Sequence, residues 1–198
     1  MAANKSLPPA PPEAGKSSFD LIDPRLLAEA LDITEVKSFA DLGCGRGRYL
    51  IALAPLMPIG AKALGVDLWA EGLDLLEEEA RNKGFGNITA IRAELGDLGG
   101  VQDASFELAL MSTVIHDLVE RHSEEKALSE AARILVPGGV LAALEFKKVD
   151  KRPGPPLAIR LNPEELKVRV EPHGFRLQKT MDMGEHLYLS LFKREGLT

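Results

Sequence analysis

Residues 39–50 read FADLGCGRGRYL and place Gly43, Gly45 and Gly47 directly after a short apolar run. Glycine lets a backbone turn sharply and lets a ligand approach the chain closely. An acidic residue, Asp41, precedes the first of these glycines. We therefore predict a buried strand over 37–42, a loop suited to contact a ligand, and a helix over 48–55.

Strand-like and helix-like segments alternate on both sides of this loop. Apolar residues at helical spacing predict a helix that begins after Asp23, with Asp23 as its N-cap and Pro24 in its first turn. Other predicted helices span 69–85, 123–139 (with a capping box at Ser123) and 162–175 (capped by Asn162). The other predicted strands span 61–68, 87–94, 106–113, 140–146, 176–181 and 186–192.

This order of elements is typical of an α/β fold in which helices connect parallel strands. The last two strands have no helical pattern between them, so they predict an antiparallel hairpin. We expect a doubly wound, Rossmann-like, mostly parallel sheet of seven strands with this C-terminal hairpin and with helices on both faces. Residues 1–18, rich in Pro, Ala and Ser, are expected to be a disordered or loosely docked arm, and 19–198 to form one domain.

Composition narrows the class of protein. The 198 residues are 45% hydrophobic and 27% charged, and no stretch approaches the ~20 apolar residues of a membrane helix. We therefore expect a cytoplasmic protein without a membrane partner. A net charge of -6 argues against general binding of nucleic acid. Cys44 is the only cysteine, which excludes an internal disulfide and a multi-cysteine metal site, so no metal is expected.

The spacing of the glycines indicates which ligand the loop contacts. A dinucleotide fingerprint, G-x-G-x-x-G, would need a glycine where Arg48 stands. A second acid, Asp67, ends the second predicted strand, where a carboxylate can accept both hydroxyls of a ribose. Asp41 suits a cationic group and would repel a pyrophosphate. An adenosine with a cationic amino-acid tail meets both conditions, and that ligand is S-adenosylmethionine (SAM).

Five blocks of the sequence carry a family resemblance. They read FADLGCGRG, ALGVDLW, IRAELGDL, SFELALMSTVIHDL and ARILVPGGVLAALEF, and they follow one another over roughly 39–146. In this order they resemble the class I SAM-dependent methyltransferases, in particular the type 11 group that is similar to quinone-biosynthesis C-methyltransferases. The resemblance implies that SAM is the cofactor and S-adenosylhomocysteine the product, with 19–198 as the methyltransferase domain.

The resemblance also assigns cofactor-binding residues by position. It implies that Asp41 and the loop from Gly43 to Gly47, Cys44 and Gly45 included, hold the methionine part. It gives Asp67 the ribose hydroxyls, and Leu68 a packing contact with adenine. The adenine amino group falls to Glu94, where the family usually has Asp, or to Asp97, with the Leu95 amide nearby. Residues 112–116, beginning with Ser112, are expected to face the sulfonium and the acceptor.

Two residues are candidates for a catalytic base. His116 lies in an apolar stretch at the end of the fourth predicted strand, and its ordinary pKa near ~6.5 suits proton removal at neutral pH. Glu145 ends the fifth strand and is the second candidate. A base is needed only where the acceptor must lose a proton, so catalysis without either remains an alternative.

Segments flanking these positions are candidates for contact with the acceptor. The basic run KKVDKR, 147–152, is a candidate for drawing in an anionic substrate, or is merely a solvated charge run. The proline-rich 153–161 is expected to cover the substrate. Phe19 and Asp20 are candidate lid residues.

The function predicted is transfer of the SAM methyl group to a small-molecule acceptor by in-line displacement. Two alternatives are a SAM-binding protein without catalysis and a nicotinamide-dependent oxidoreductase. A lone cysteine argues against thiol-dependent methylation of metalloids. The residues STVIHD after the fourth strand, in place of an Asn-Pro-Pro-Tyr motif, argue against amino methylation of bases or glutamine. The identity of the acceptor, the methylated atom and the oligomeric state are left open.

Overall fold

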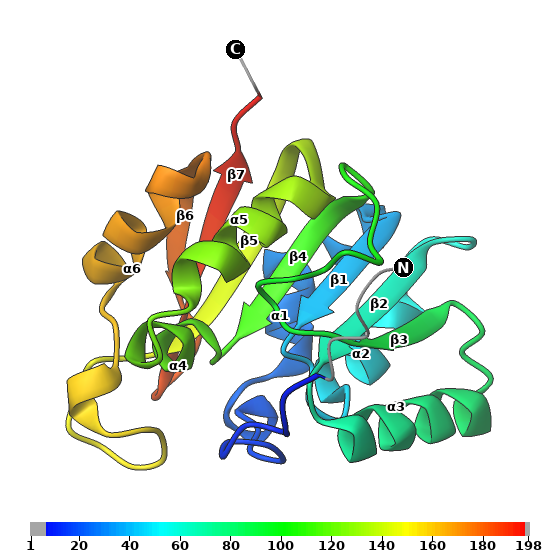
Figure 1. Ribbon diagram of the computed structural model, residues 1–198, viewed down its shortest axis with the longest axis horizontal. Helices are drawn as coiled ribbons and strands as arrows, with labels where there is room; N and C mark the ends of the chain where they lie inside the picture. Colours follow the sequence, from blue (N-terminus) through cyan, green and yellow to red (C-terminus); the bar gives the residue numbers. More distant parts are fainter. Residues whose placement is uncertain (1–6, 197–198) are drawn as a thin grey trace.

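Seven strands form one sheet in the order β3-β2-β1-β4-β5-β7-β6 in the computed structural model, which describes residues 7–196 (Figure 1). The strands are β1 (Ser38–Leu42), β2 (Lys62–Asp67), β3 (Ile88–Arg92), β4 (Phe106–Ser112), β5 (Leu135–Phe146), β6 (Phe175–Asp182) and β7 (Leu187–Arg194). The α-helices are α1 (Pro24–Ala30), α2 (Arg48–Leu53), α3 (Ala70–Lys83), α4 (Ile115–Glu120), α5 (Glu124–Ile134) and α6 (Pro163–Val170). Short 3-10 turns are η1 (Phe19–Leu21), η2 (Ile33–Glu35), η3 (Ala54–Leu56), η4 (Leu157–Ile159) and η5 (Glu171–His173).

The first five strands in sequence are mutually parallel, and the last two are antiparallel to their neighbours. β7 lies between β5 and β6, so the predicted hairpin enters the sheet with its second strand inward. The predicted mostly parallel, seven-stranded α/β sheet is confirmed. Strand order reverses between β1 and β4, and such a switch point is where open α/β sheets bind ligands.

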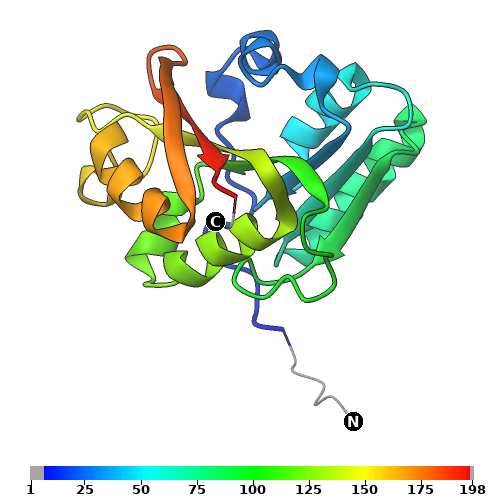
Figure 2. The same cartoon turned by 90° about the horizontal axis from the view of Figure 1, so that it is seen from above.

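Helices cover both faces of the sheet (Figure 2). Residues of β1 alternate between the faces: Phe39 packs in the core with α1, α2 and α3, and Ala40 packs in the core with α4, α5 and α6. The five residues of β1 are all buried, as expected for a central parallel strand covered on both sides.

The predicted starts of two helices are confirmed by their caps. Asp23 Oδ1 accepts a hydrogen bond from the Arg25 N–H (2.9 Å) at the start of α1. At α6, Asn162 Oδ1 accepts from the Glu165 N–H (2.9 Å), and Glu165 Oε2 accepts from the Asn162 N–H (2.8 Å). This reciprocal pair is the capping box that fixes where α6 begins.

The predicted helix over 123–139 begins where expected, with Ser123 as its N-cap, but its predicted capping box and its predicted end are wrong. Ser123 makes no capping bond, since its Oγ donates to the Leu118 carbonyl instead. The helix ends at Ile134, and positions 137–139, Pro-Gly-Gly, belong to β5. The register between β4 and β5 shifts there, so these residues form an irregularity in the strand. Glycine fits this place because Gly138 has a φ of +81°.

A short helix, α4, follows β4 and carries His116. Part of the predicted N-terminal arm, 1–6, lies outside the described residues. In residues 7–196, no helix has the length and apolar character needed to cross a membrane.

Candidate functional site

A cavity of about 820 Å³ lies at the carboxyl ends of the parallel strands, at the switch point between β1 and β4. In Figure 1 this is the lower edge of the sheet, where the blue N-terminal segment and α4 lie. The walls of this main cavity come from Pro11, 13–18 and Leu21, Gly43 and Gly45, Asp67 and Leu68, 93–96, 112–114, 116–118, 120–123, Lys126, Phe146, 153–156 and Ile159.

The glycine loop combines three different requirements. A Cβ at Gly45 (φ +56°) would meet no described atom within 4 Å, so Gly45 borders open cavity. A Cβ at Gly43 would lie 2.6 Å from Val114 Cγ2, and one at Gly47 would overlap the side chain of Leu76. Of the three loop glycines, Gly43 and Gly45 line the cavity and Gly47 does not. Gly47 is therefore required for packing beneath the loop.

Asp67 is held at the cavity wall by backbone amides. Its Oδ2 accepts from the Gly45 N–H (2.7 Å) and its Oδ1 from the Trp69 N–H (2.9 Å). Each carboxylate oxygen can accept another hydrogen bond. Leu68 lines the cavity beside it. The Asp67 carboxylate therefore keeps free acceptor capacity at the wall of the cavity, next to the apolar side chain of Leu68.

Asp41 is fully buried beneath the loop, and neither carboxylate oxygen has a hydrogen-bond partner among the described residues. Burial raises the pKa of Asp41 to about 8, and the nearby charge of Asp67 adds to this rise. Asp41 does not line the main cavity itself. A buried carboxylate without a donor fits a cationic group next to the loop, such as the ammonium of a methionine tail.

The two candidates for the adenine contact differ in position. Glu94 and Leu95 line the main cavity, whereas Asp97 does not. Cys44 is buried in the loop, and burial raises the pKa of its thiol well above the ordinary value. This thiol is a small core group and not a thiolate nucleophile.

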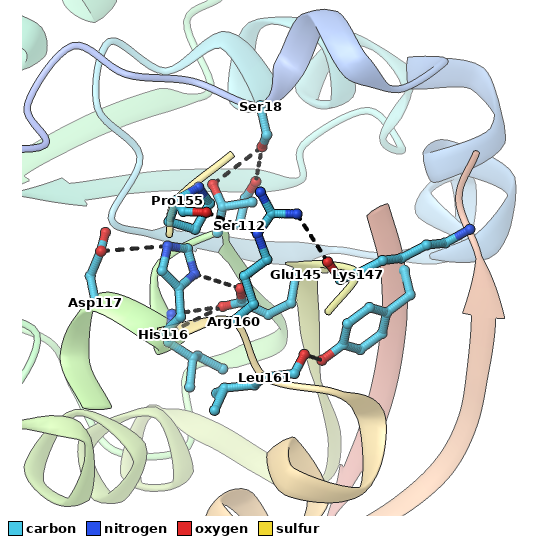
Figure 3. A network of polar contacts seen from close by, with 12 residues as sticks. Ser18, Ser112, His116, Asp117, Glu145, Lys147, Pro155, Arg160 and Leu161 are labelled. Carbon is cyan, nitrogen blue, oxygen red and sulfur yellow. Dashed lines mark hydrogen bonds and ion pairs between the residues drawn. The ribbon is translucent and has the colours of Figure 1, made fainter. Parts of the chain in front are cut away.

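The described part of the N-terminal segment lies against the cavity. Ser18 Oγ lies 2.9 Å from Tyr49 Oη and 3.3 Å from Thr113 Oγ1. It also lies 3.3 Å from Ser112 Oγ (Figure 3). These three partners come from α2 and from the end of β4, so one buried hydroxyl ties the segment to the sheet. Glu13 also forms an ion pair with Arg121, just after α4.

The candidate lid residues 19 and 20 contact α2. Asp20 forms an ion pair with Arg48, the residue that replaces the third glycine of a dinucleotide fingerprint. The guanidinium of Arg48 lies 4.5 Å from the centre of the Phe19 ring, and this ring stacks edge-on against Tyr49. Arg48 therefore fastens η1 over the start of α2.

His116 and Glu145 form a buried pair next to the cavity (Figure 3). His116 Nδ1 lies 2.6 Å from Glu145 Oε2. Glu145 Oε1 accepts from the Ile115 N–H (2.9 Å) and the His116 N–H (3.3 Å) at the start of α4. His116 lines the main cavity, whereas Glu145 does not. Glu145 therefore orients His116 from behind and also holds the helix that carries it.

Opposing effects set the pKa of His116. Burial lowers it, but the hydrogen bond and the charge of Glu145, with Asp117 and Glu120, outweigh burial and raise the pKa above the ordinary value. Asp117 Oδ1 lies 3.4 Å from His116 Nε2, and burial raises the pKa of Asp117 as well. When Nδ1 donates to Glu145, Nε2 of the neutral ring carries the free lone pair.

The loop that follows Glu145 is organised by Arg160. This buried guanidinium donates to the carbonyl oxygens of Pro155 (2.9 Å), Val149 (2.8 Å) and Lys151 (2.8 Å). Positions 153–156 thereby line the main cavity, in keeping with the predicted covering role of 153–161. Figure 3 shows Arg160 beside His116 and Glu145.

The basic run 147–152 is largely neutralised within the chain. Lys147 pairs with Asp182 (2.6 Å), Lys148 with Glu165 (2.6 Å) and Lys151 with Glu185 (3.0 Å). The run therefore offers little free positive charge for an anionic substrate.

Sequence reasoning missed Ser18 and Arg160 as site residues. Ser18 stood in a low-complexity segment and carried no signal of its own. Arg160 did carry one: it stands alone in the apolar run LAIRL, and a lone arginine in such a run indicates a buried cation that needs several acceptors.

Comparison with known families agrees with this geometry. The family model described as "Methyltransferase domain" (Methyltransf_11) matches residues 40–143, which include the glycine loop and most of β5. The chain belongs to this family, the class I SAM-dependent methyltransferases. SAM is the cofactor of the family, and the residues at the main cavity fit it.

Individual relatives share part of this sequence. The chain is 36% identical over 107 residues to the arsenite methyltransferase of Aquipseudomonas alcaligenes, covering 51% of this chain and 30% of that one. It is 33% identical over 116 residues to the ubiquinone/menaquinone biosynthesis C-methyltransferase UbiE of Campylobacter jejuni, covering 57% and 46%. The chain thus spans less than half the length of both relatives.

A crystal structure of a SAM dependent methyltransferase from Aquifex aeolicus has the same fold over nearly the whole chain. The TM-score is 0.80 at 22% identity, with 93% of this chain and 94% of that one covered. The likeness extends beyond the family match to the elements outside residues 40–143, including the C-terminal hairpin.

Proposed function

We propose that this protein transfers the methyl group of SAM to a small-molecule acceptor by in-line displacement. The observation that carries the proposal is the arrangement around Gly45: an open cavity beside the loop, the ordered carboxylate of Asp67 on the wall, and the unpartnered carboxylate of Asp41 beneath. Together they suit a ligand with both a ribose and a cationic tail.

The chain's residues contribute mainly position and exclusion of water. Asp67 would hold the ribose hydroxyls, Asp41 would neutralise the ammonium, and Leu68 and Glu94 would border the adenine. When bound, SAM supplies a methyl group activated by its sulfonium, and the C–S bond breaks as the acceptor–methyl bond forms, leaving S-adenosylhomocysteine. Alignment of two reactants in such a site can contribute roughly 7–11 kcal/mol to lowering the barrier.

His116 is the proposed base for an acceptor that carries a proton. Glu145 keeps Nδ1 protonated and points Nε2 away from itself, because the Nδ1–Oε2 distance is 2.6 Å. Nε2 would take the proton of a hydroxyl, amine or activated carbon as that atom bonds to the methyl group. Asp117, 3.4 Å from Nε2, would stabilise the imidazolium that results.

The acceptor is proposed to differ from that of the arsenite methyltransferase. Thiol-dependent methylation of a metalloid needs more than one reactive thiolate. This chain has Cys44 alone, and burial raises the pKa of that thiol. An organic small molecule is the better match to a cavity that includes Leu68, Val114 and Phe146.

A SAM-binding protein without catalysis is the second candidate function. The observation that favours it is the burial of His116, which is only 3% exposed. A nicotinamide cofactor is disfavoured because Arg48 replaces the required glycine and because the chain belongs to a SAM-dependent family. Turnover against an acceptor panel separates the two SAM-binding candidates.

Isothermal titration with SAM and with S-adenosylhomocysteine tests the proposal. We expect micromolar binding of both, and loss of at least tenfold in affinity in Asp67→Ala. Asp74→Ala, in α3 and outside the cavity lining, is the matched control and should bind as the parent does. Absence of binding to either molecule by the parent protein would contradict the proposal.

A further inference from the structure

A second cavity, of about 590 Å³, lies beside the main cavity and shares three of its lining residues, His116, Glu120 and Ile159. We call it the side cavity. It lies between α4, η4 and α6, and its walls are His116, Val119, Glu120, Lys148, 158–162, Glu164, Glu165, Val168 and Arg169. Because His116 belongs to both cavities, a molecule in the side cavity can present one end to the base next to the cofactor site.

The wall of the side cavity is aliphatic where a ligand's body would lie. Val119, Ile159, Leu161 and Val168 come from α4, η4 and α6 and from the residues between η4 and α6. Val168 is 64% exposed, an unusual state for a branched aliphatic side chain on a helix whose other apolar residues, such as Leu166, are buried. Apolar surface left open along a cavity gains free energy when an apolar ligand covers it.

The cations on the wall are all engaged by the protein itself. Lys148 pairs with Glu165 at 2.6 Å, and Arg169 pairs with Glu124 at 2.8 Å. The guanidinium of Arg160 donates its hydrogen bonds to backbone carbonyl oxygens of its own loop. An anionic ligand would therefore find no free positive partner here, and it would lose hydration without compensation.

Among the lining carboxylates, Glu120 alone has no cation within 4.0 Å in the described residues 7–196. Glu120 is exposed at the rim, where water screens its charge, and exposed ion pairs contribute little to binding. The negative charge of Glu120 would repel an anionic ligand, and its exposure makes it a weak partner for a cationic ligand.

We propose that the side cavity is the acceptor subsite, and that it takes an uncharged, predominantly apolar molecule whose reacting group lies at His116. This inference rests on the proposed methyltransferase function and adds the class and location of the acceptor. The apolar body would lie against Val119, Ile159 and Val168, with the reacting group pointing into the main cavity.

Three probes that share the naphthalene ring and differ in charge test this preference: 2-naphthol, 2-naphthoate and 2-naphthylmethylammonium. Each is titrated calorimetrically into the full chain saturated with S-adenosylhomocysteine. We expect 2-naphthol to bind at least tenfold more tightly than either charged probe. Tighter binding of the carboxylate or the ammonium overturns the assignment, and so does failure of all three to bind.

A second measurement locates the probe. Amide shifts in a ¹⁵N spectrum should change at Val119, Ile159 and Val168 when 2-naphthol is added. Val168→Asp should weaken 2-naphthol binding at least tenfold, while Leu26→Asp, at a leucine on α1 that is 54% exposed, should not. Shift changes confined to the glycine loop would overturn the subsite.

The saturation step distinguishes this inference from the proposed function. S-adenosylhomocysteine binding without 2-naphthol binding rejects the acceptor subsite alone. Absence of S-adenosylhomocysteine binding rejects the methyltransferase proposal on which it rests.

Discussion

His116 Nδ1, on α4, lies 2.6 Å from Glu145 Oε2, on the neighbouring strand β5, and both residues are almost completely buried. The other oxygen of Glu145 accepts two backbone N–H groups at the start of α4. One carboxylate thus fixes the ring orientation of His116, raises its pKa and anchors the helix that bears it. This combination gives the imidazole a defined free nitrogen next to the main cavity.

Glu145→Gln should lower the pKa of His116. The amide keeps the size of the side chain and one acceptor oxygen, but it removes the charge that outweighs burial. An NMR titration of the imidazole Cε1–H measures the change. Asp117→Asn should give a smaller decrease, since Asp117 lies farther away, at 3.4 Å. An unchanged pKa in Glu145→Gln contradicts this account.

The same substitution should change how stability depends on pH. The folded-state pKa of His116 lies above 6.5, so the pairing stabilises the fold fully below pH 6.5 and loses this contribution as pH rises through the folded pKa. The loss of Tm in Glu145→Gln relative to the parent should therefore be largest near pH 6 and decrease at higher pH. A difference that grows with pH would count against the pairing.

Asp41→Asn should stabilise the protein without cofactor at alkaline pH. The pKa of Asp41 rises from 3.8 to about 8 in the fold, chiefly through burial. The fold therefore favours the protonated acid, and stability decreases as pH rises from the unfolded-state pKa toward about 8. At pH 8 the amide variant should be more stable than the parent, because the amide carries no charge that burial can penalise.

For SAM binding, in contrast to the stability of the cofactor-free protein, Asp should be better than Asn at position 41. Asn cannot neutralise an ammonium, so Asp41→Asn should bind SAM at least tenfold more weakly than the parent. Thermal unfolding at pH 6 and pH 8, with and without SAM, measures both effects. A variant that is less stable at pH 8, or that binds SAM normally, contradicts the role given to Asp41.

Gly45→Ala and Gly84→Ala should separate backbone strain from loss of cofactor space. Gly45 has a φ of +56° and Gly84 a φ of +73°, and a Cβ at either position meets no described atom within 4 Å. Each substitution should cost roughly 1–2 kcal/mol of stability through the left-handed backbone. Only Gly45 lines the main cavity, so only its variant should lose SAM affinity, by at least tenfold.

Gly47→Ala completes this comparison. Its Cβ would overlap Leu76 in the core. We therefore expect Gly47→Ala to lose about 1–3 kcal/mol more stability than Gly45→Ala. Chemical denaturation followed by circular dichroism gives the three values, and calorimetry gives the affinities. Equal affinities in the Gly45 and Gly84 variants would contradict the assignment of Gly45.

The sheet and the place of the glycine loop at its switch point were predictable because they depend on local pattern. Parallel strands buried on both faces are continuous apolar runs, as β1 is, and each cap of α1 and α6 is contained within four residues. Asp67 was also accessible to prediction, because the end of β2 must lie beside the loop after β1 in a doubly wound sheet.

The parts that sequence reasoning missed depend on distant contacts. α4 has six residues, too few for a helical period, and it begins where Glu145 accepts two of its N–H groups from 29 and 30 positions away. The hydrogen-bond partners of Ser18 lie 31 to 95 residues further along the chain. Pro137-Gly138-Gly139 looked like a helix end because a strand irregularity uses the same residues.

Arg160→Met should loosen the loop that covers the main cavity. Arg160 donates to carbonyl oxygens between Lys147 and Pro155, and its guanidinium lies 5.6 Å from the centre of the Phe146 ring. Methionine keeps the apolar stem but donates no hydrogen bond. The carbonyl oxygens would then need water as a partner, and the loop must open to admit it. We expect faster proteolytic cleavage between 147 and 160 and a stability loss of about 1–3 kcal/mol.

Arg169→Met is the matched control, because this guanidinium on α6 is about half exposed and pairs with Glu124 of α5, not with carbonyl oxygens of the loop. Its removal should change neither the cleavage rate in 147–160 nor the SAM affinity. Limited proteolysis followed by mass spectrometry locates the cuts in both variants. If Arg160→Met is cleaved no faster than the control, the loop is held by its own backbone and prolines, and the shape of the acceptor side does not depend on Arg160.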